Sequence, residues 1–260
     1  MPELPDVESY RQYLDATALH KAIHSTEVLD ERILDHISRK KLQQTLENNR
    51  FIATLRHGKH LFSHLDSGPF LVLHFGMTGY LRYFKERTNM PDHTRLLITF
   101  DTQYHLAFVC MRLLGHVGIS DSIKNVVSRN DLGPDAESIT AETLYRAAEN
   151  SRAAIKSLLM NQSVIAGIGN VYSDEILFQA GIHPAVKAGS LDRGSIDRIV
   201  GCMETVVETA VQNNAEIDSY PEYFLLPHRG KDGECPRCGG QLKQKKISGR
   251  TAWFCQTCQS

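Results

Sequence analysis

Four cysteines near the C-terminus constrain the fold of this chain more than any other sequence feature. Cys235 and Cys238 form one C-x2-C pair, and Cys255 and Cys258 form a second pair after sixteen intervening residues. Each pair suits a tight turn that presents two sulfurs, and two such turns at this spacing can surround Zn²⁺ tetrahedrally. Disulfides are the alternative, but they need an oxidising compartment, and the N-terminus lacks the basic and apolar stretches of a secretory signal.

The zinc is expected to be structural. A segment of roughly 30 residues cannot close an apolar core, so metal binding should supply its folding free energy, on the order of 10–16 kcal/mol. Four protein ligands leave no open coordination position, which places any catalysis elsewhere. Between the cysteine pairs, the alternation in KQKKISGRTAWF predicts a hairpin with Arg250 at its tip. An Arg there can contact a phosphate, although a solvated Arg without a ligand is ordinary.

The charges are unevenly distributed along the chain. The formal net charge is −1, yet residues 228–260 hold seven Lys or Arg against two Asp or Glu. A basic C-terminal segment on an otherwise acidic chain predicts that this segment binds a polyanion. The alternative is that its charged side chains are only solvated by water. No apolar run is long enough to cross a membrane, so we expect an intracellular protein, cytoplasmic if the source is prokaryotic, with no membrane partner.

The hydrophobic pattern changes its period along the chain. Within 23–110, short β-branched or aromatic stretches alternate with Gly, Pro, Asp and Asn, which predicts an antiparallel sandwich or barrel. A short helix precedes them, and the segment 129–138 reads as a linker. From residue 141 onward the pattern is helical, and the stretch 195–215 has the spacing of a buried stripe. The order is therefore a β-rich part, a helical part and a zinc ribbon.

Three local features are candidates for chemistry. Pro2 directly follows Met1; Pro suits a first helical turn, but removal of Met1 would leave a free secondary amine. Gly-rich residues precede Asn170, a good N-cap at a helix start that can attract phosphate, although most such turns only join two helices. Met77 occupies a turn between strands, where it either plugs a gap or acts as a wedge between bases.

Together these segments resemble the formamidopyrimidine-DNA glycosylase / endonuclease VIII family of base-excision repair enzymes. The resemblance covers nearly the whole chain, in the family's order. It rests on PELPDVE at the start, RHGKHL with its lysine, HFGMTG as the intercalation loop, AIKSLLMNQ with GIGNVYSDEILFQAGIHP as the helix-two-turn-helix segment, and the terminal CQTC of the zinc finger.

The resemblance implies an α+β multidomain fold and a bifunctional enzyme. The domains would be an N-terminal antiparallel β-sandwich catalytic domain (1–130), a helix-two-turn-helix DNA-binding domain (131–225) and a zinc finger (226–260). The partner would be double-stranded damaged DNA, bound by a monomer. The activity would be removal of flipped oxidised bases, namely formamidopyrimidines with 8-oxoguanine as a second candidate, followed by AP lyase cleavage through β,δ-elimination.

Four residues would be catalytic by this resemblance. Pro2 would be the nucleophile that forms a Schiff base, and its α-amino pKa of about 7.7–8, against about 10.4 for Lys, leaves much more of it neutral near pH 7 than of a lysine. Glu3 would be the acid/base, although a first-turn acid that complements its helix dipole is the simpler interpretation. Lys59 would lie near the lesion, and Arg250 would grip its phosphates.

Eight residues would contact DNA. Met77 and Leu114 would fill the space of the flipped base, and Arg112 would pair with the orphaned base. Asn170 would grip a phosphate. The others are Lys156 and Arg152 along a basic path, Glu175 as an acid facing the active centre, and His93 near the DNA face; their simpler interpretations are ordinary surface or strand residues.

The sequence also departs from the family. Cys110 and Met111 occupy the positions where the formamidopyrimidine branch has Asp-Pro. Leu113 replaces a second Arg of that branch, and Leu114 replaces a Phe that acts as a wedge. The segment 215–234 is short where the formamidopyrimidine branch covers a flipped 8-oxoguanine. Two alternatives stay open: an endonuclease VIII-type glycosylase for oxidised pyrimidines, and a non-catalytic protein that holds nucleic acid through its zinc ribbon.

Overall fold

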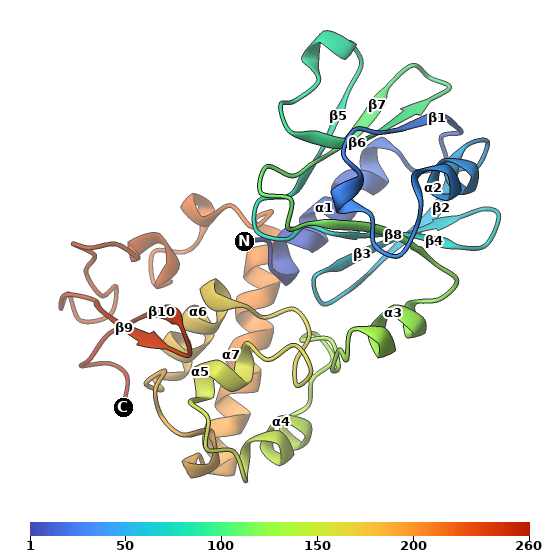
Figure 1. The fold of residues 1–260 in the computed structure, drawn as a ribbon. Helices are drawn as coiled ribbons and strands as arrows, with labels where there is room; N and C mark the ends of the chain where they lie inside the picture. The colour runs from blue at the N-terminus through green and yellow to red at the C-terminus, as the bar shows by residue number, and fades with distance from the viewer. The chain divides into compact units, whose positions relative to one another are not determined.

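The computed structural model describes all 260 residues, which divide into two compact units (Figure 1). The β unit consists of Met1–Pro2 and Asp6–Asn130, and the helical unit consists of Glu3–Pro5 and Asp131–Ser260. Helix α1 (Leu4–Thr17) follows the first three residues. The short segment Glu3–Pro5 therefore belongs to the helical unit although it lies at the start of the chain.

The β unit contains two four-stranded antiparallel sheets, with strand orders β1-β6-β7-β5 and β2-β3-β4-β8. One buried cluster includes Phe51 and Leu71 from one sheet and Leu96 and Phe108 from the other, so the sheets share a core. The predicted antiparallel sandwich is confirmed. The strands are β1 (Ile23–Val28), β2 (Phe51–His57), β3 (His60–Leu65), β4 (Phe70–His74), β5 (Tyr80–Phe84), β6 (Thr94–Phe100), β7 (His105–Val109) and β8 (His116–Ser120).

Three elements of the β unit were not predicted. Helix α2 (Arg39–Leu46) buries only Leu42 and Leu46. Two apolar residues are too few to distinguish an amphipathic helix from a loop in the sequence. Strand β8 lies beyond residue 110, and helix α3 (Ile123–Arg129) buries Val126 alone. Each of these elements depends on packing against its neighbours more than on its own sequence.

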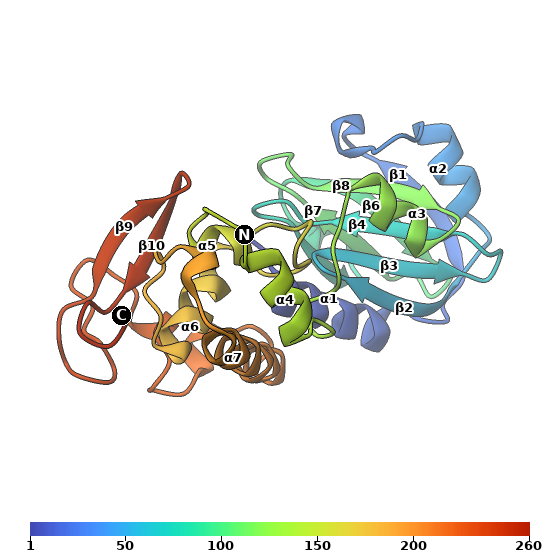
Figure 2. The ribbon, with the colours of Figure 1, turned by 90° about the horizontal axis from the view of Figure 1, so that it is seen from below.

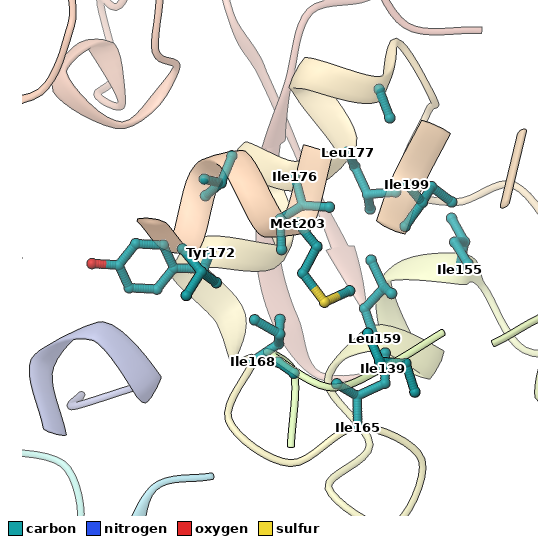
Figure 3. Close-up of a cluster of buried hydrophobic side chains, with 14 of the residues drawn as sticks. Ile139, Ile155, Leu159, Ile165, Ile168, Tyr172, Ile176, Leu177, Ile199 and Met203 are labelled. Carbon is teal, nitrogen blue, oxygen red and sulfur yellow. The ribbon is translucent and has the colours of Figure 1, made fainter. Parts of the chain in front are cut away.

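The helical unit is built around four helices and one hydrophobic cluster (Figure 3). They are α4 (Ala141–Ala148), α5 (Ile155–Leu159), α6 (Asn170–Ala180) and α7 (Arg193–Gln212). The predicted stripe on α7 is confirmed for Ile196, Ile199, Met203, Val206, Val207 and Ala210, whereas Val200 is only partly buried. The helical pattern expected from residue 141 onward is interrupted before α5, because Ala154 is extended and forms a bridge with Lys187.

The C-terminal hairpin has the predicted form (Figure 2). Strands β9 (Lys243–Ile247) and β10 (Arg250–Phe254) are antiparallel, and Ile247 pairs with Arg250 across the turn. Ser248 and Gly249 both have positive φ, 47° and 76°, as a two-residue type I′ hairpin turn requires. Short 3-10 turns complete the fold at Glu31–Ile33, Arg87–Asn89, Ala188–Ser190, Ile217–Ser219 and Leu226–His228.

Two loops of the β unit are in backbone contact. Gly76 has a φ of 59°, and a Cβ added to it would lie 2.3 Å from the carbonyl carbon of Leu114. The backbone N–H of Arg112 donates to Thr78 Oγ1 at 3.4 Å. The turn that carries Arg112 and Leu114 therefore lies directly against the loop that carries Met77.

Replacing Gly76 should destabilise the β unit. In Gly76→Ala the new methyl group collides with rigid backbone as well as adopting an unfavourable φ, so we expect a loss of about 2–4 kcal/mol in the free energy of unfolding, measured by denaturant titration. Gly68→Ala is the matched control, because its φ is also positive but nothing lies within 4 Å. Equal losses for the two variants would contradict the packing account.

Candidate active site and zinc centre

The carboxylate of Glu3 caps the N-terminus of helix α6. Its Oε2 accepts from the N–H of Gly169 at 2.6 Å and of Tyr172 at 3.3 Å, and its Oε1 accepts from the N–H of Val171 at 2.8 Å. Glu3 is fully buried. The N-terminal amides of a helix lack internal partners and carry partial positive charge, so they bind a carboxylate well. Glu3 therefore serves a helix other than the one that it precedes in the chain.

Asn170 does not have its predicted capping role. It is the first residue of α6, and the N-cap position is taken by Gly169, which has no side chain to cap with. Glu3 supplies the missing acceptor. The Oδ1 atom of Asn170 is buried without a hydrogen-bond partner, which is an uncommon state for an acceptor oxygen.

The glycine-containing turn before α6 packs closely against residues near the N-terminus of the chain. Gly167 has a φ of 116°, and a Cβ there would lie 2.8 Å from a side-chain carbon of Leu4. The N–H of Leu4 also donates to the carbonyl of Gly167 at 3.0 Å. The sequence pattern indicated a close approach by a phosphate, whereas the structure fills that space with residues 3–5.

Lys156 does not lie on a basic surface path, which corrects the prediction from the sequence. It is fully buried, and its Nζ donates to Asp174 Oδ1 at 2.5 Å, to the carbonyl of Asn170 at 2.8 Å and to Ser173 Oγ at 3.0 Å. Burial lowers the pKa of Lys156 and raises that of Asp174, and the attraction within the pair opposes both shifts. Asp174 and its second partner Arg229 were missed, because nothing local in the sequence distinguishes them.

Glu175 is a second correction. It is fully buried, not exposed toward a ligand, and accepts from the N–H of Leu225 at 3.0 Å, the N–H of Leu226 at 2.8 Å and Gln179 Nε2 at 2.7 Å. Burial raises its pKa, and these hydrogen bonds oppose the shift. Its carboxylate thus fastens the segment before the zinc ribbon to α6.

The turn beside the Met77 loop exposes two apolar side chains. Met111 is 58% exposed and Leu114 is 45% exposed, which is unusual for residues of this size. Arg112 is exposed between them, and Met77 is half-buried. Leu113 has a φ of 54° and packs against the sandwich core. The loop that carries Met77 and the turn that carries Arg112 and Leu114 are therefore neighbours.

The other predicted site residues lie at surface positions. Lys59 is half-buried in the turn between β2 and β3, and His93 is exposed just before β6. Arg152 is exposed before α5, and Arg250 is exposed at the first position of β10. Pro2 is the covalent neighbour of Glu3, so the position of the capped carboxylate constrains it.

The four cysteines meet the geometric requirement for zinc. Their sulfurs all lie within 4.8 Å of one another, with Cys235 and Cys258 separated by 3.8 Å and Cys238 and Cys255 by 3.5 Å. Tetrahedral Zn–S bonds of about 2.3 Å require sulfurs roughly 3.8 Å apart. The donor set is complete with four thiolates, which suits a structural ion. Cys110 and Cys202 lie outside it; Cys110 is buried and Cys202 partly so.

Comparison with known proteins agrees with this geometry over the whole chain. The model of the formamidopyrimidine-DNA glycosylase N-terminal domain matches residues 1–117, that of its H2TH domain residues 132–220, and that of the zinc finger found in FPG and IleRS residues 233–260. A formamidopyrimidine-DNA glycosylase of Pelotomaculum thermopropionicum is 31% identical, covering 100% of this chain and 99% of that protein.

Solved structures are similar over the same extent. MutM in complex with DNA containing carbocyclic 8-oxo-G has a TM-score of 0.91 and 27% identity, with 100% of each chain covered. The Lactococcus lactis Fpg (MutM) in complex with DNA containing FAPY-dG has a TM-score of 0.90 and 26% identity, with 99% of this chain and 100% of that chain covered. None of the helices of the present chain is long and apolar enough to cross a membrane.

These findings confirm the α+β fold with its zinc finger, the single structural zinc and damaged DNA as the partner. They also favour the enzyme over the non-catalytic binding protein. The chain belongs to the formamidopyrimidine-DNA glycosylase family and is a DNA glycosylase of base-excision repair.

Proposed function

We propose that this chain excises formamidopyrimidines from duplex DNA and then cleaves the strand, with Pro2 as the nucleophile. One observation carries the proposal: the residue next to Pro2 is held by three N–H groups at the start of α6. A nucleophile works best when its approach is fixed before the substrate arrives. The anchored Glu3 carboxylate restricts the first residues of the chain in this way.

The chemistry requires a free Pro2 nitrogen. With Met1 removed, the neutral secondary amine attacks C1′ of the flipped nucleotide, and the C1′–N bond to the damaged base breaks. The open sugar is then joined to Pro2 as an iminium ion. This electron sink acidifies the C2′ proton, and its removal expels the 3′ phosphate; a second elimination expels the 5′ phosphate.

The remaining residues have supporting roles in this proposal. Glu3 moves a proton at the sugar ring oxygen, and Lys59 neutralises phosphate charge near the lesion. Asn170, in the first turn of α6, donates from its side-chain NH2 group, and Arg250, at the hairpin turn, donates from its guanidinium; both grip the phosphate backbone. Met77, Arg112 and Leu114, on two neighbouring loops of the sandwich, fill the space left by the base. Arg152 and His93 add weaker contacts to the backbone at the surface.

The segment 215–234 supports formamidopyrimidines as the preferred lesions. Family members of the formamidopyrimidine branch use this region to cover a flipped 8-oxoguanine. Here it is short, contains the turns Ile217–Ser219 and Leu226–His228, and buries Tyr220 and Phe224. Because Glu175 also fastens it to α6, little chain is left to close over a purine. We propose that 8-oxoguanine is a poorer substrate.

We also propose where and in what form the protein acts. Zinc-bound thiolates persist where thiols stay reduced, which supports an intracellular location beside the DNA. The division into 1–130, 131–225 and 226–260 would separate chemistry, DNA grip and metal. A monomer suffices, since one chain carries every group that the reaction needs.

Borohydride trapping tests the function directly. Duplexes carrying a formamidopyrimidine, 8-oxoguanine, an oxidised pyrimidine or an abasic site should each be incubated with the enzyme and reductant. We expect a covalent adduct whose mass maps to Pro2, formed fastest on the formamidopyrimidine among the damaged bases. An adduct on Lys59, or none, would refute the role of Pro2, and a preference for the pyrimidine would support the endonuclease VIII type.

Substituting Glu3 should separate the two steps of the reaction. Glu3→Gln keeps the shape but places an amide where an acceptor and proton carrier is needed, so we expect base release to slow by roughly 10²–10⁴-fold. Trapping on a preformed abasic site needs no base departure and should fall much less. Single-turnover kinetics on both substrates measure the difference, and equal losses would assign Glu3 a purely structural role.

Removing the zinc should weaken DNA binding and leave the β unit folded. In Cys238→Ser one thiolate is lost, and the small apolar cluster of the ribbon cannot compensate. We expect DNA affinity to fall at least tenfold, a change of about 1.4 kcal/mol, while strand signals of the sandwich persist in circular dichroism. Cys202→Ser, outside the metal site, is the control, and loss of the whole fold would contradict this modular account.

A further inference from the structure

One buried carboxylate in the helical unit joins four segments of the chain. Asp174, on α6, is 1% exposed. Its Oδ1 accepts from Lys156 of α5, and its Oδ2 accepts from the N–H of Trp253 on β10 at 3.1 Å and lies 3.1 Å from Arg229. Every strong donor around this carboxylate therefore comes from a different element.

The residues around Asp174 contact both the helix turn that holds Glu3 and the hairpin that carries Arg250. Lys156 donates to the carbonyl of Asn170 in the first turn of α6, whose amides hold Glu3. Trp253 lies on the same strand as Arg250, and the other strand of that hairpin carries no comparable buried tie to α6. At the hairpin turn, Ser248 Oγ lies 2.6 Å from Ser157 Oγ of α5, but both side chains are exposed. The Asp174 bond is thus a buried hydrogen bond between the hairpin and α6, beside the apolar packing of Trp253 on the cluster that contains Phe178.

The charges of the cluster balance when Lys156 and Asp174 are both ionised. Lys156 and Arg229 are positive, Asp174 and Glu3 are negative, and Lys156 is close enough to Glu3 for the two to interact. A buried ion pair contributes little net stability compared with apolar packing, but removing one partner leaves a costly unpaired charge. Such a network is best explained by the geometry that it enforces.

We propose that Asp174 is a positioning residue for the reaction: its carboxylate holds the Arg250 hairpin on the helix turn that anchors Glu3. The inference rests on the proposed role of Arg250 in gripping phosphate. Asp174 touches no substrate, and it acts on Arg250 through β10. Its loss should therefore be felt as the loss of the Arg250 contact with DNA.

A double-mutant cycle with Arg250 provides the test. In Asp174→Asn the shape is kept, but one carboxylate oxygen that served Trp253 and Arg229 is lost. We expect affinity for an abasic-analogue duplex to fall about tenfold and the slope of log K against log salt to drop by about one, as for Arg250→Gln. The double variant should be no weaker than Arg250→Gln alone. Additive losses would overturn the proposal.

Controls separate positioning from general damage. Glu142 also binds two arginines, Arg146 and Arg193, but at the surface, so Glu142→Gln should leave the salt slope unchanged. Zinc content should stay at one per chain in every variant. If Asp174→Asn fails to fold, the apolar pair Lys156→Met with Asp174→Leu removes the tie without an orphaned lysine and should show the same non-additivity.

The proposed function and this inference fail in different ways. An unchanged salt slope in Arg250→Gln would refute the phosphate contact and, with it, the purpose assigned to Asp174. A reduced slope in Arg250→Gln, with an unchanged slope in Asp174→Asn, would preserve the contact and refute only the positioning role. Borohydride trapping at Pro2 is independent of both results.

Discussion

The structure depends on one interaction, the carboxylate of Glu3 bound to the amides at the N-terminus of α6. It joins residue 3 to residues 169–172, and so brings the start of the chain into the helical unit. Helix amides without partners are a strong anion site, and here the anion is part of the protein. The proposed nucleophile, Pro2, directly precedes this anchored residue in the chain.

Buried polar groups hold the C-terminal part of the helical unit in place, where few apolar side chains are buried. Apolar side chains from α5, α6 and α7 form its main core, but the zinc ribbon contributes only a few buried side chains of its own. Asp174 and Glu175, neighbours on α6, reach opposite parts of the C-terminal segment with fully paired carboxylates. Together with the four thiolates, they replace the core that so short a segment cannot build.

Much of the fold could be predicted from local pattern. The strands, the α7 stripe and the type I′ hairpin turn follow from periodicity and turn chemistry, which act over a few residues. Helices α2 and α3 and strand β8 could not be predicted, because each has too few periodic residues to signal itself. Asn170 and Lys156 were misjudged for another reason: their partners lie elsewhere in the chain, and solvent exposure is decided by those partners.

By itself the sequence determined the metal ligands, the order of β-rich, helical and zinc-binding parts, and the family, because cysteine spacing and motifs are properties of neighbouring residues. Only the tertiary structure decided that Glu3 caps α6, that Glu175 and Lys156 are buried, and that Asp174 joins four segments. The sequence does not show whether a given Asp or Glu is exposed to water or bound at the end of a helix. Its role is set by desolvation and by the donors that folding brings to it.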